Sequence, residues 1–283
     1  MNPPNPQPQT LPKKTTMITL KEAIEMLKSA GISSPEYDAR ELFRAFSGLK
    51  EPLNIRSSSD AYELKTAIKR RVAREPLQYI VGSVGFYREE YKVTPDCLIP
   101  RSDTEILVDY AVKNIPEGES FADLCSGSGC VGISTLKNTT GTRCDSFDIS
   151  DGALAITLEN AESNGVAHRL SAIKKDLLTE TIDKEYFAIL SNPPYIPKEV
   201  YEGLDKEIFA EPEIAFVGGE DGLIFYKRLV PMCMERIKPN GFLAFEIGYD
   251  QGQSLLNIAE KNRLKCQIIK DYSGNDRVAV LKK

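Results

Sequence analysis

A glycine-rich segment, with an acidic residue downstream of it, is the first candidate for ligand binding in this chain of 283 residues. Residues 123–129 read DLCSGSG, and the spacing Gly127-x-Gly129-x-x-Gly132 fits the dinucleotide fingerprint. Glycines at such a turn let the backbone approach a ligand and leave amide groups free at a helix N-terminus. Asp148 follows Gly127 by 21 residues, the usual offset of an acid that binds ribose hydroxyls. Together they predict a site for an adenosine-containing cofactor.

Two cofactors compete for this turn: an NAD-type dinucleotide, which would make the protein a dehydrogenase, and S-adenosyl-L-methionine (SAM). Asp123 favours SAM, because its carboxylate can pair with the cationic amino-acid end of that cofactor and would repel a pyrophosphate. A third interpretation is a turn that only permits tight packing of strand against helix.

The run Asn192-Pro193-Pro194-Tyr195 is the second candidate. Its prolines fix φ and remove two N–H donors, which leaves a rigid turn with free carbonyls. The Asn192 side-chain oxygen and the Pro193 carbonyl can then accept both hydrogens of one planar NH₂ group, and Tyr195 can stack on its face. An amide or an exocyclic amine of a base fits that geometry, whereas a plain strand-ending turn is the alternative. The tripeptide recurs at residues 2–4 with no strand before it, so context carries the signal.

The elements that must position these residues alternate between strand and helix from residue 120 onward. Helices are predicted after the glycine-rich turn and over residues 151–163, 222–237 and 250–262, and strands over residues 121–125, 143–150, 170–176, 186–192, 241–248, 266–273 and 276–282. This alternation predicts an open, mostly parallel α/β sheet, whose ligand lies beyond the carboxyl ends of the strands. The closing pair must be antiparallel, because the link Gly274-Asn275 is too short for a parallel crossover.

Residues 17–83 are predicted to form a small N-terminal helical domain. Its helix signals are a capping box at Thr19-x-x-Glu22, an N-cap at Ser34 before Pro35, and a start at Asp60-x-x-Glu63. Residues 1–16 are Pro-rich and polar, which predicts a disordered tail and makes Met17 a candidate start. A linking β-hairpin is predicted within residues 84–97, and residues 98–283 are predicted to form the cofactor-binding domain.

Composition excludes several classes of protein. With 41% hydrophobic and 27% charged residues, the chain can form a packed core. It has no apolar run of ~18 residues and no apolar signal segment, so neither a membrane span nor secretion is predicted. The six cysteines form no C-x-x-C pair, which fits a reduced, cytoplasmic protein, and Cys125 and Cys130 are expected to pack in the core without binding a metal. His168 is the only histidine and is expected at the surface.

Charge is divided unevenly along the chain. Residues 1–90 carry a net charge of +3 and residues 91–283 a net charge of −8. The acidic part argues against tight binding of duplex nucleic acid, since phosphate contacts need Lys and Arg. A solvated helix surface explains the slight basicity of the first part. We also expect that part to bind an acidic partner, with Arg70 and Arg71 as contacts.

Several stretches in combination resemble the peptide chain release factor glutamine methyltransferases, also called the HemK family. They are LIPRSDTEILVD (98–109), NPPYIP (192–197), EPEIAFVGGEDGL (211–223), FEIGYDQGQ (245–253) and DYSGNDRVAVLK (271–282). The resemblance runs from about Met17 to Lys283. Residues 101–105 favour this branch over the related ribosomal protein L3 glutamine methyltransferases.

The resemblance implies a Rossmann-like, class I SAM-dependent methyltransferase with a seven-stranded sheet whose last strand is antiparallel. Such an enzyme would methylate the side-chain amide nitrogen of the glutamine in the Gly-Gly-Gln loop of class I release factors. The family's acceptor motif falls on Asn192 to Tyr195. Its cofactor contacts fall on Asp123, Cys125, Ser126, Gly127, Ser128, Gly129, Asp148, Asp176, Leu177 and Asn192.

Two positions depart from the family pattern. Cys125 stands where the family usually has Gly, so a special backbone conformation there would be strained. Leu177 stands where some members have an aromatic residue, which predicts weaker stacking on adenine. A monomer is expected.

Alternatives stay open at this stage. One is a nucleic-acid amino methyltransferase acting on adenine N6 or cytosine N4, because the same turn suits a flipped base. Another is a SAM-fold protein that only binds a translation partner. Glu246 could line the site or have a structural role at the sheet edge. The side chains of Arg101, Asp103 and Glu105 could brace the interdomain region or cap a helix.

Overall fold

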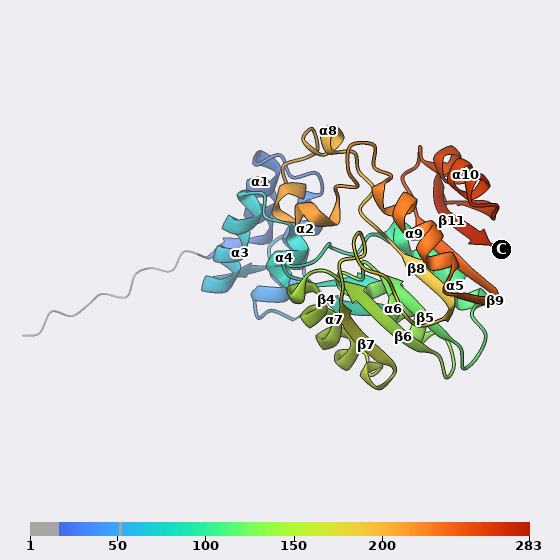
Figure 1. Cartoon of the computed structure of the whole chain (residues 1–283). Helices are drawn as coiled ribbons and strands as arrows, with labels where there is room; N and C mark the ends of the chain where they lie inside the picture. Colours follow the sequence, from blue (N-terminus) through green and yellow to red (C-terminus); the bar gives the residue numbers. More distant parts are fainter. Residues whose placement is uncertain (1–16, 51–52) are drawn as a thin grey trace, which may run out of the picture. The chain divides into compact units, whose positions relative to one another are not determined.

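The computed structural model describes residues 17–50 and 53–283, so the predicted tail over residues 1–16 lies outside the described residues. The chain divides into two compact units between Val81 and Gly82. The first unit is helical, and the second is built on a seven-stranded sheet (Figure 1).

The described part of the helical unit holds four helices and a short strand pair. Their bounds are β1 Ile18–Thr19, α1 Leu20–Ser29, α2 Pro35–Phe46, β2 Ser58–Ser59, α3 Tyr62–Val72 and α4 Leu77–Val81. The predicted capping box is present: the Thr19 hydroxyl accepts from Glu22 N at 3.1 Å, and the Glu22 carboxylate accepts from Thr19 N at 2.8 Å. Buried side chains on three helices, including Leu27, Leu42 and Leu64, form the core of this unit.

The other two helix starts differ from each other. α2 begins at Pro35 as predicted, although the Ser34 hydroxyl makes no capping hydrogen bond. The start predicted at Asp60 is wrong, because α3 begins at Tyr62 with Ala61 in the N-cap position. The Ser59 hydroxyl accepts from Ala61 N at 3.2 Å, and this turn carries the chain past Asp60 before the helix begins.

Arg71 is buried in the helical unit and is not a surface contact. It is 4% exposed, and its Nε donates to the Asp38 carboxylate at 2.6 Å. The prediction that Arg71 contacts a partner is therefore wrong, because its guanidinium is buried and paired with Asp38. Replacing Arg71 would leave the Asp38 charge buried without its partner. Arg70 does lie at the surface, where it pairs with Glu75.

The second unit begins with the predicted hairpin, formed by β3 Ser83–Phe86 and β4 Glu89–Lys92. Its sheet has the order β10-β11-β9-β8-β5-β6-β7. The strands are β5 Ser120–Leu124, β6 Arg143–Asp148, β7 Leu170–Lys174, β8 Tyr186–Ser191, β9 Ile237–Glu246, β10 Lys265–Lys270 and β11 Asp276–Lys282. β11 is antiparallel to both neighbours, and the remaining strands run parallel to one another, as predicted.

Helices cover both faces of the sheet (Figure 1). Their bounds are α5 Glu105–Asn114, α6 Cys130–Lys137, α7 Asp151–Ser163, α8 Lys198–Tyr201, α9 Ile224–Met234 and α10 Gly252–Lys261. α5, α6 and α7 pack into one core and α9 and α10 into the other. Side chains along β5 alternate between them, with Phe121 in the first core and Ala122 and Leu124 in the second.

The order of the strands reverses at β5. The next strands in the chain, β6 and β7, lie on one side of β5, whereas β8 and β9 lie on the other. The connections after β5 and β8 therefore diverge, and a crevice forms at this switch point. Within the described residues, no helix has both the length and the apolar character needed to span a membrane.

Candidate active site

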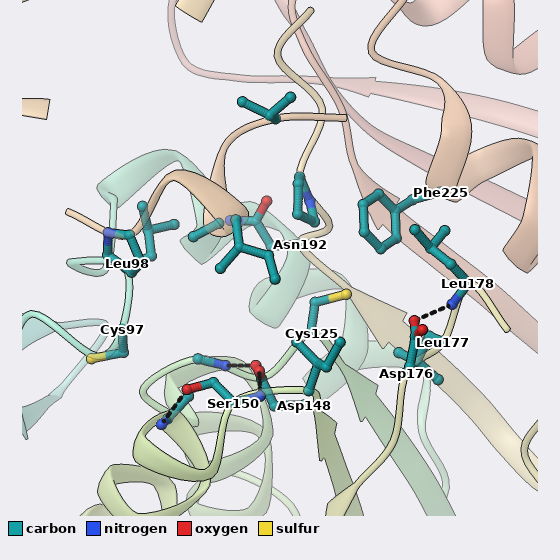
Figure 2. A pocket seen from close by; sticks show the side chains of 18 of the residues that line it. Cys97, Leu98, Cys125, Asp148, Ser150, Asp176, Leu177, Leu178, Asn192 and Phe225 are labelled. Carbon is teal, nitrogen blue, oxygen red and sulfur yellow. Dashed lines mark hydrogen bonds between the residues drawn. The ribbon is translucent and has the colours of Figure 1, made fainter. Parts of the chain in front are cut away.

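A cavity of about 340 Å³ lies at the carboxyl ends of β5 to β8 (Figure 2). This volume falls in the range of about 300–1,000 Å³ that is typical of small-molecule sites. The predicted site residues on its wall are Cys125, Gly127, Asp148, Asp176, Leu177, Asn192 and Pro194. A small adjoining pocket shares some of these residues and adds Asp123, Ser126 and Ser128. Gly129, Pro193 and Tyr195 line neither space.

The turn after β5 has a left-handed backbone at three positions. Cys125 has φ +58°, Gly127 +55° and Gly129 +79°. Only the two glycines adopt such angles without a steric cost, so Cys125 holds the conformation in which strain was expected. A Cβ at Gly129 would lie 2.9 Å from Thr157 Cγ2, so that position needs glycine for space as well. The Thr157 hydroxyl donates to the Gly127 carbonyl at 3.0 Å and ties the turn to α7.

Asp123 connects β5 to the first turn of α6. It is 1% exposed, and its Oδ2 accepts from Gly132 N at 2.9 Å. Burial raises the pKa of this carboxyl to about 7. A Cβ at Gly132 would lie 3.0 Å from the same oxygen. Gly132, the third glycine of the fingerprint, therefore makes room for the Asp123 carboxylate. A negative charge at this place would repel a pyrophosphate.

Asp148 presents its carboxylate at the end of β6. Oδ2 accepts from Gly127 N and Oδ1 from Ser150 N, each at 2.9 Å (Figure 2). Burial raises the pKa of the carboxyl, and these backbone hydrogen bonds oppose the rise. Because each carboxylate oxygen can accept a further hydrogen bond, Asp148 can bind a pair of hydroxyls such as those of a ribose.

Apolar side chains form another part of the wall. Leu177 and Leu178 follow β7, and Phe225 of α9 lies beside Leu178 (Figure 2). Asp176 holds this corner: its Oδ1 accepts from Leu178 N at 3.0 Å, and its Oδ2 accepts from the Thr179 hydroxyl at 2.8 Å. Phe225 supplies an aromatic ring to a site where residue 177 has none, so a planar base can be covered there.

Sequence reasoning missed several residues of the wall. They include Phe225, Ser150 and the pair Cys97 and Leu98 (Figure 2), together with Ile149. Ile149 and Ser150 directly follow Asp148, so the position after a strand end was the available signal. The others are ordinary apolar residues at unremarkable spacing, and only the three-dimensional fold brings them to the cavity.

The acceptor turn follows β8. Asn192 Nδ2 donates to the Thr104 hydroxyl at 3.2 Å, whereas Asn192 Oδ1 accepts no hydrogen bond from the residues that the structure describes. The Pro193 carbonyl is likewise without a donor from that part of the chain. Neither of the two acceptors predicted to bind an NH₂ group is therefore occupied by a donor from the described residues, and Asn192 also lines the cavity. Tyr195 is half-buried, and its carbonyl accepts from Gln251 Nε2 at 3.0 Å.

Glu246 lies behind this turn. It ends β9, which is an interior strand, so its predicted place at a sheet edge is wrong. The side chain is 1% exposed, and its Oε1 accepts from the Tyr195 hydroxyl at 3.3 Å. Burial raises the pKa of the Glu246 carboxyl to about 7, against the opposing effects of hydrogen bonding to Thr104 and Tyr195 and of the Arg277 charge. Burial also raises the pKa of Tyr195.

The polar residues ahead of α5 brace the second unit internally. The side chains of Arg101, Asp103 and Glu105 contact, in that order, Glu211, Arg277 and the Tyr87 amide. Tyr87 belongs to the linking hairpin, so Glu105 braces that region as predicted. Arg101 and Asp103 pair with residues of the second unit outside the hairpin.

The burial of the cysteines and of the histidine tests what the sequence predicted for them. Cys130 is buried, which confirms its predicted place in the core, whereas Cys125 is half-buried, packs against a core and lines the cavity. Cys97, Cys144 and Cys233 are also buried, and His168 is exposed as predicted. Burial raises the pKa of these thiols. Residues 17–50 and 53–283 contain no cluster of His, Cys, Asp or Glu side chains that could hold a metal ion.

Comparison with known proteins adds two family matches and a similar fold. The family model described as Methyltransferase small domain matches residues 102–219, which include the turns around the cavity. The model described as PrmC N-terminal domain matches residues 19–82. The solved structure of a ribosomal protein L11 methylase from Lactobacillus delbrueckii subsp. bulgaricus has a TM-score of 0.50 and 19% identity, over 68% of this chain and 83% of that chain. The second unit thus has the class I methyltransferase fold.

Curated relatives match nearly the whole chain. A release factor glutamine methyltransferase from Moorella thermoacetica is 35% identical over 91% of this chain and 95% of its own length. Another, from Caulobacter vibrioides, is 34% identical over 91% of this chain and 93% of its own length. Because this likeness spans both units and the acceptor turn, the chain belongs to the release factor glutamine methyltransferase family.

Proposed function

We propose that the protein transfers a methyl group from SAM to the side-chain amide nitrogen, N5, of the glutamine in the Gly-Gly-Gln loop of class I peptide chain release factors. The observation that carries this proposal is the turn after β8. There, Asn192 Oδ1 and the Pro193 carbonyl are both left without a donor from the described residues. Curated relatives with this name match most of the chain.

SAM fits the residues of the cavity. Leu177, Leu178 and Phe225 can cover the adenine, and Asp148 can accept from the ribose hydroxyls. Residues 125–128 of the turn and the Asp123 carboxylate border the smaller pocket, which suits the cationic amino-acid end. When bound, SAM supplies an electrophilic methyl group and leaves as S-adenosyl-L-homocysteine.

The acceptor is held by the turn. An amide nitrogen is a poor nucleophile, because its lone pair is delocalised into the carbonyl. Asn192 Oδ1 and the Pro193 carbonyl accept its two N–H groups, which fixes the position and orientation of the nitrogen. The same two oxygens stabilise the positive charge that develops on the nitrogen during attack. A proton then leaves the nitrogen for solvent.

Catalysis therefore rests on positioning and electrostatics. The rigid Pro193-Pro194 pair keeps the turn in one conformation and supplies no competing N–H donor. His168, the only imidazole of the chain, lies outside the cavity wall, so the proposed mechanism uses no histidine base.

We further infer that the protein acts as a monomer in the cytoplasm and that its helical unit contacts the release factor. Free thiols at Cys125, Cys130, Cys144, Cys233 and Cys266 support a reducing compartment. The net charge of +3 over residues 1–90 and the exposed Arg70 support contact with an acidic surface.

An acceptor panel tests the proposal. Labelled SAM is supplied to the enzyme with a purified class I release factor, with ribosomal protein L3 and with a DNA duplex, in separate reactions. We expect label on the release factor alone. Label on L3 or on DNA, with none on the release factor, would overturn the proposed acceptor.

A further inference from the structure

We propose that Thr104 is a positioning residue that sets which end of the Asn192 side-chain amide faces the acceptor. This inference rests on the proposed function, because it concerns the same turn. Thr104 would act through Asn192 and would not itself touch the acceptor or the cofactor.

The geometry of the Thr104–Asn192 pair carries the inference. Thr104 immediately precedes α5 and is 2% exposed, so its hydroxyl cannot exchange freely with water. Its Oγ1 accepts from Asn192 Nδ2 at 3.2 Å. The two ends of an asparagine amide have nearly the same shape, and only their hydrogen bonds decide which end points where. With Nδ2 held by Thr104, Oδ1 is the end left for the acceptor.

A flipped amide would defeat the site. The NH₂ group of Asn192 would then face the NH₂ group of the acceptor, two donors with no acceptor between them. The Pro193 carbonyl alone would remain to bind the glutamine. The orientation of Asn192 is therefore as important to methyl transfer as its presence.

The Glu246 carboxylate lies close to the Thr104 hydroxyl. Burial raises the pKa of this carboxyl to about 7, the Thr104 side chain opposes that rise, and Oε2 has no hydrogen-bond partner among the described residues. Above its pKa, Glu246 can only accept, so it attracts the threonine proton and leaves the threonine lone pairs available for Asn192 Nδ2. The Tyr195 hydroxyl donates to Glu246 Oε1 at 3.3 Å and ties the same carboxylate to the far end of the acceptor turn.

Two substitutions test this role, one that removes the hydroxyl and one that keeps it. Thr104→Val removes the hydroxyl and keeps the volume, whereas Thr104→Ser keeps the hydroxyl. We expect Thr104→Val to lower kcat for methyl transfer to the release factor by about two- to twelvefold, the factor for loss of one hydrogen bond. The Kd for SAM should stay within twofold, and Thr104→Ser should recover most of kcat.

A matched control separates this role from general loss of a buried hydroxyl. Thr135 of α6 is 0% exposed, and its hydroxyl has no hydrogen-bond partner among the residues described by the structure. Thr135→Val should leave kcat at the wild-type value. The inference is overturned if Thr104→Val matches the wild type in kcat, or if Thr104→Ser falls as far as Thr104→Val.

A second measurement does not depend on any acceptor. The side-chain ¹⁵N–¹H resonances of Asn192, assigned with an Asn192→Asp variant, report the hydrogen bond to Thr104 directly. We expect them to shift in Thr104→Val and to keep the wild-type position in Thr104→Ser. Asn192 side-chain resonances with unchanged chemical shifts in Thr104→Val would overturn the inference. A wild-type enzyme that leaves release factors unlabelled would overturn the proposed function instead, and the resonances would still decide the role of Thr104.

Discussion

Asn192 is the single residue on which methyl transfer depends most directly. Its Oδ1 faces no donor among the described residues, and its Nδ2 is held by Thr104. Removal of an aimed hydrogen-bonding group at a reacting centre typically costs ~10²–10³ in rate. Asn192→Ala should therefore lower kcat by about that factor and leave the Kd for labelled SAM within a few fold. Equal losses of binding and turnover would show that the residue serves the cofactor and not the acceptor.

Cys125 tests the cofactor turn. Its φ of +58° is unfavourable for any residue with a side chain and worst for a β-branched one. Cys125→Val should lower the free energy of unfolding by roughly 1–3 kcal/mol and weaken SAM binding. Cys125→Gly relieves the strain at the same position and should bind SAM at least as well as the wild type. Thermal melts and equilibrium dialysis of both variants check this, and a Val variant as stable as the Gly variant would contradict it.

Glu246 links burial to the pH dependence of stability. Its pKa is raised from 4.5 to about 7, so the folded protein binds an extra proton between those values. The free energy of unfolding must therefore fall as pH rises through that window. Asp123, with a pKa raised from 3.8 to about 7, contributes in the same direction.

Glu246→Gln removes one of these two contributions. Glutamine binds no proton, so the loss of thermal stability between pH 5 and pH 8 should be smaller in Glu246→Gln than in the wild type, while Asp123 maintains part of it. Melting temperatures at both pH values measure the difference. An identical pH dependence of the two proteins would mean that Glu246 keeps an ordinary pKa in the folded state.

At the scale of elements, the helix caps of the helical unit differ in what they contribute. Thr19 makes a reciprocal capping box with Glu22, whereas Ser34 precedes α2 without a capping bond. Thr19→Ala should lower the free energy of unfolding of this unit by ~0.5–2 kcal/mol, and Ser34→Ala by clearly less. Denaturant titration followed by circular dichroism compares them, and equal losses would contradict the assignment of the caps.

Strands and helices could be predicted where the spacing of apolar residues agrees with the capping and turn residues that flank it. The helix over residues 151–163 and the strand over residues 276–282 have the predicted bounds. α5 was not predicted, because its buried side chains follow a segment whose polar residues were interpreted as functional. β9 begins four residues before its predicted start at Gly241, because Pro239, a residue that disfavours a strand interior, lies within the strand.

The site was predictable where chemistry concentrates at strand ends. Asp148 and Asn192 follow β6 and β8, and the fold brings both to one cavity. Phe225 could not be predicted, because it comes from α9 and reaches the cavity only through the packing of that helix. The role of Thr104 could not be predicted either, because its partner Asn192 is 88 residues away in the chain and only the fold brings the two side chains together.

At the scale of the whole molecule, the two units divide the work. The second unit contains the cavity and both turns, and its acidic balance is unlike that of a nucleic-acid enzyme. The helical unit matches its own family model and carries the basic excess. Arg71 shows how charge alone misleads, because its guanidinium is committed to Asp38 in the interior.

The most direct test of the central claim uses a purified class I release factor from the same source and a copy in which the glutamine of its Gly-Gly-Gln loop is changed. Both are incubated with the enzyme and labelled SAM, and incorporated label is located by mass spectrometry. Label on the side-chain amide of that glutamine in the intact factor, and none on the changed copy, is the predicted result. Label on both factors, or on neither while SAM binding persists, would contradict it.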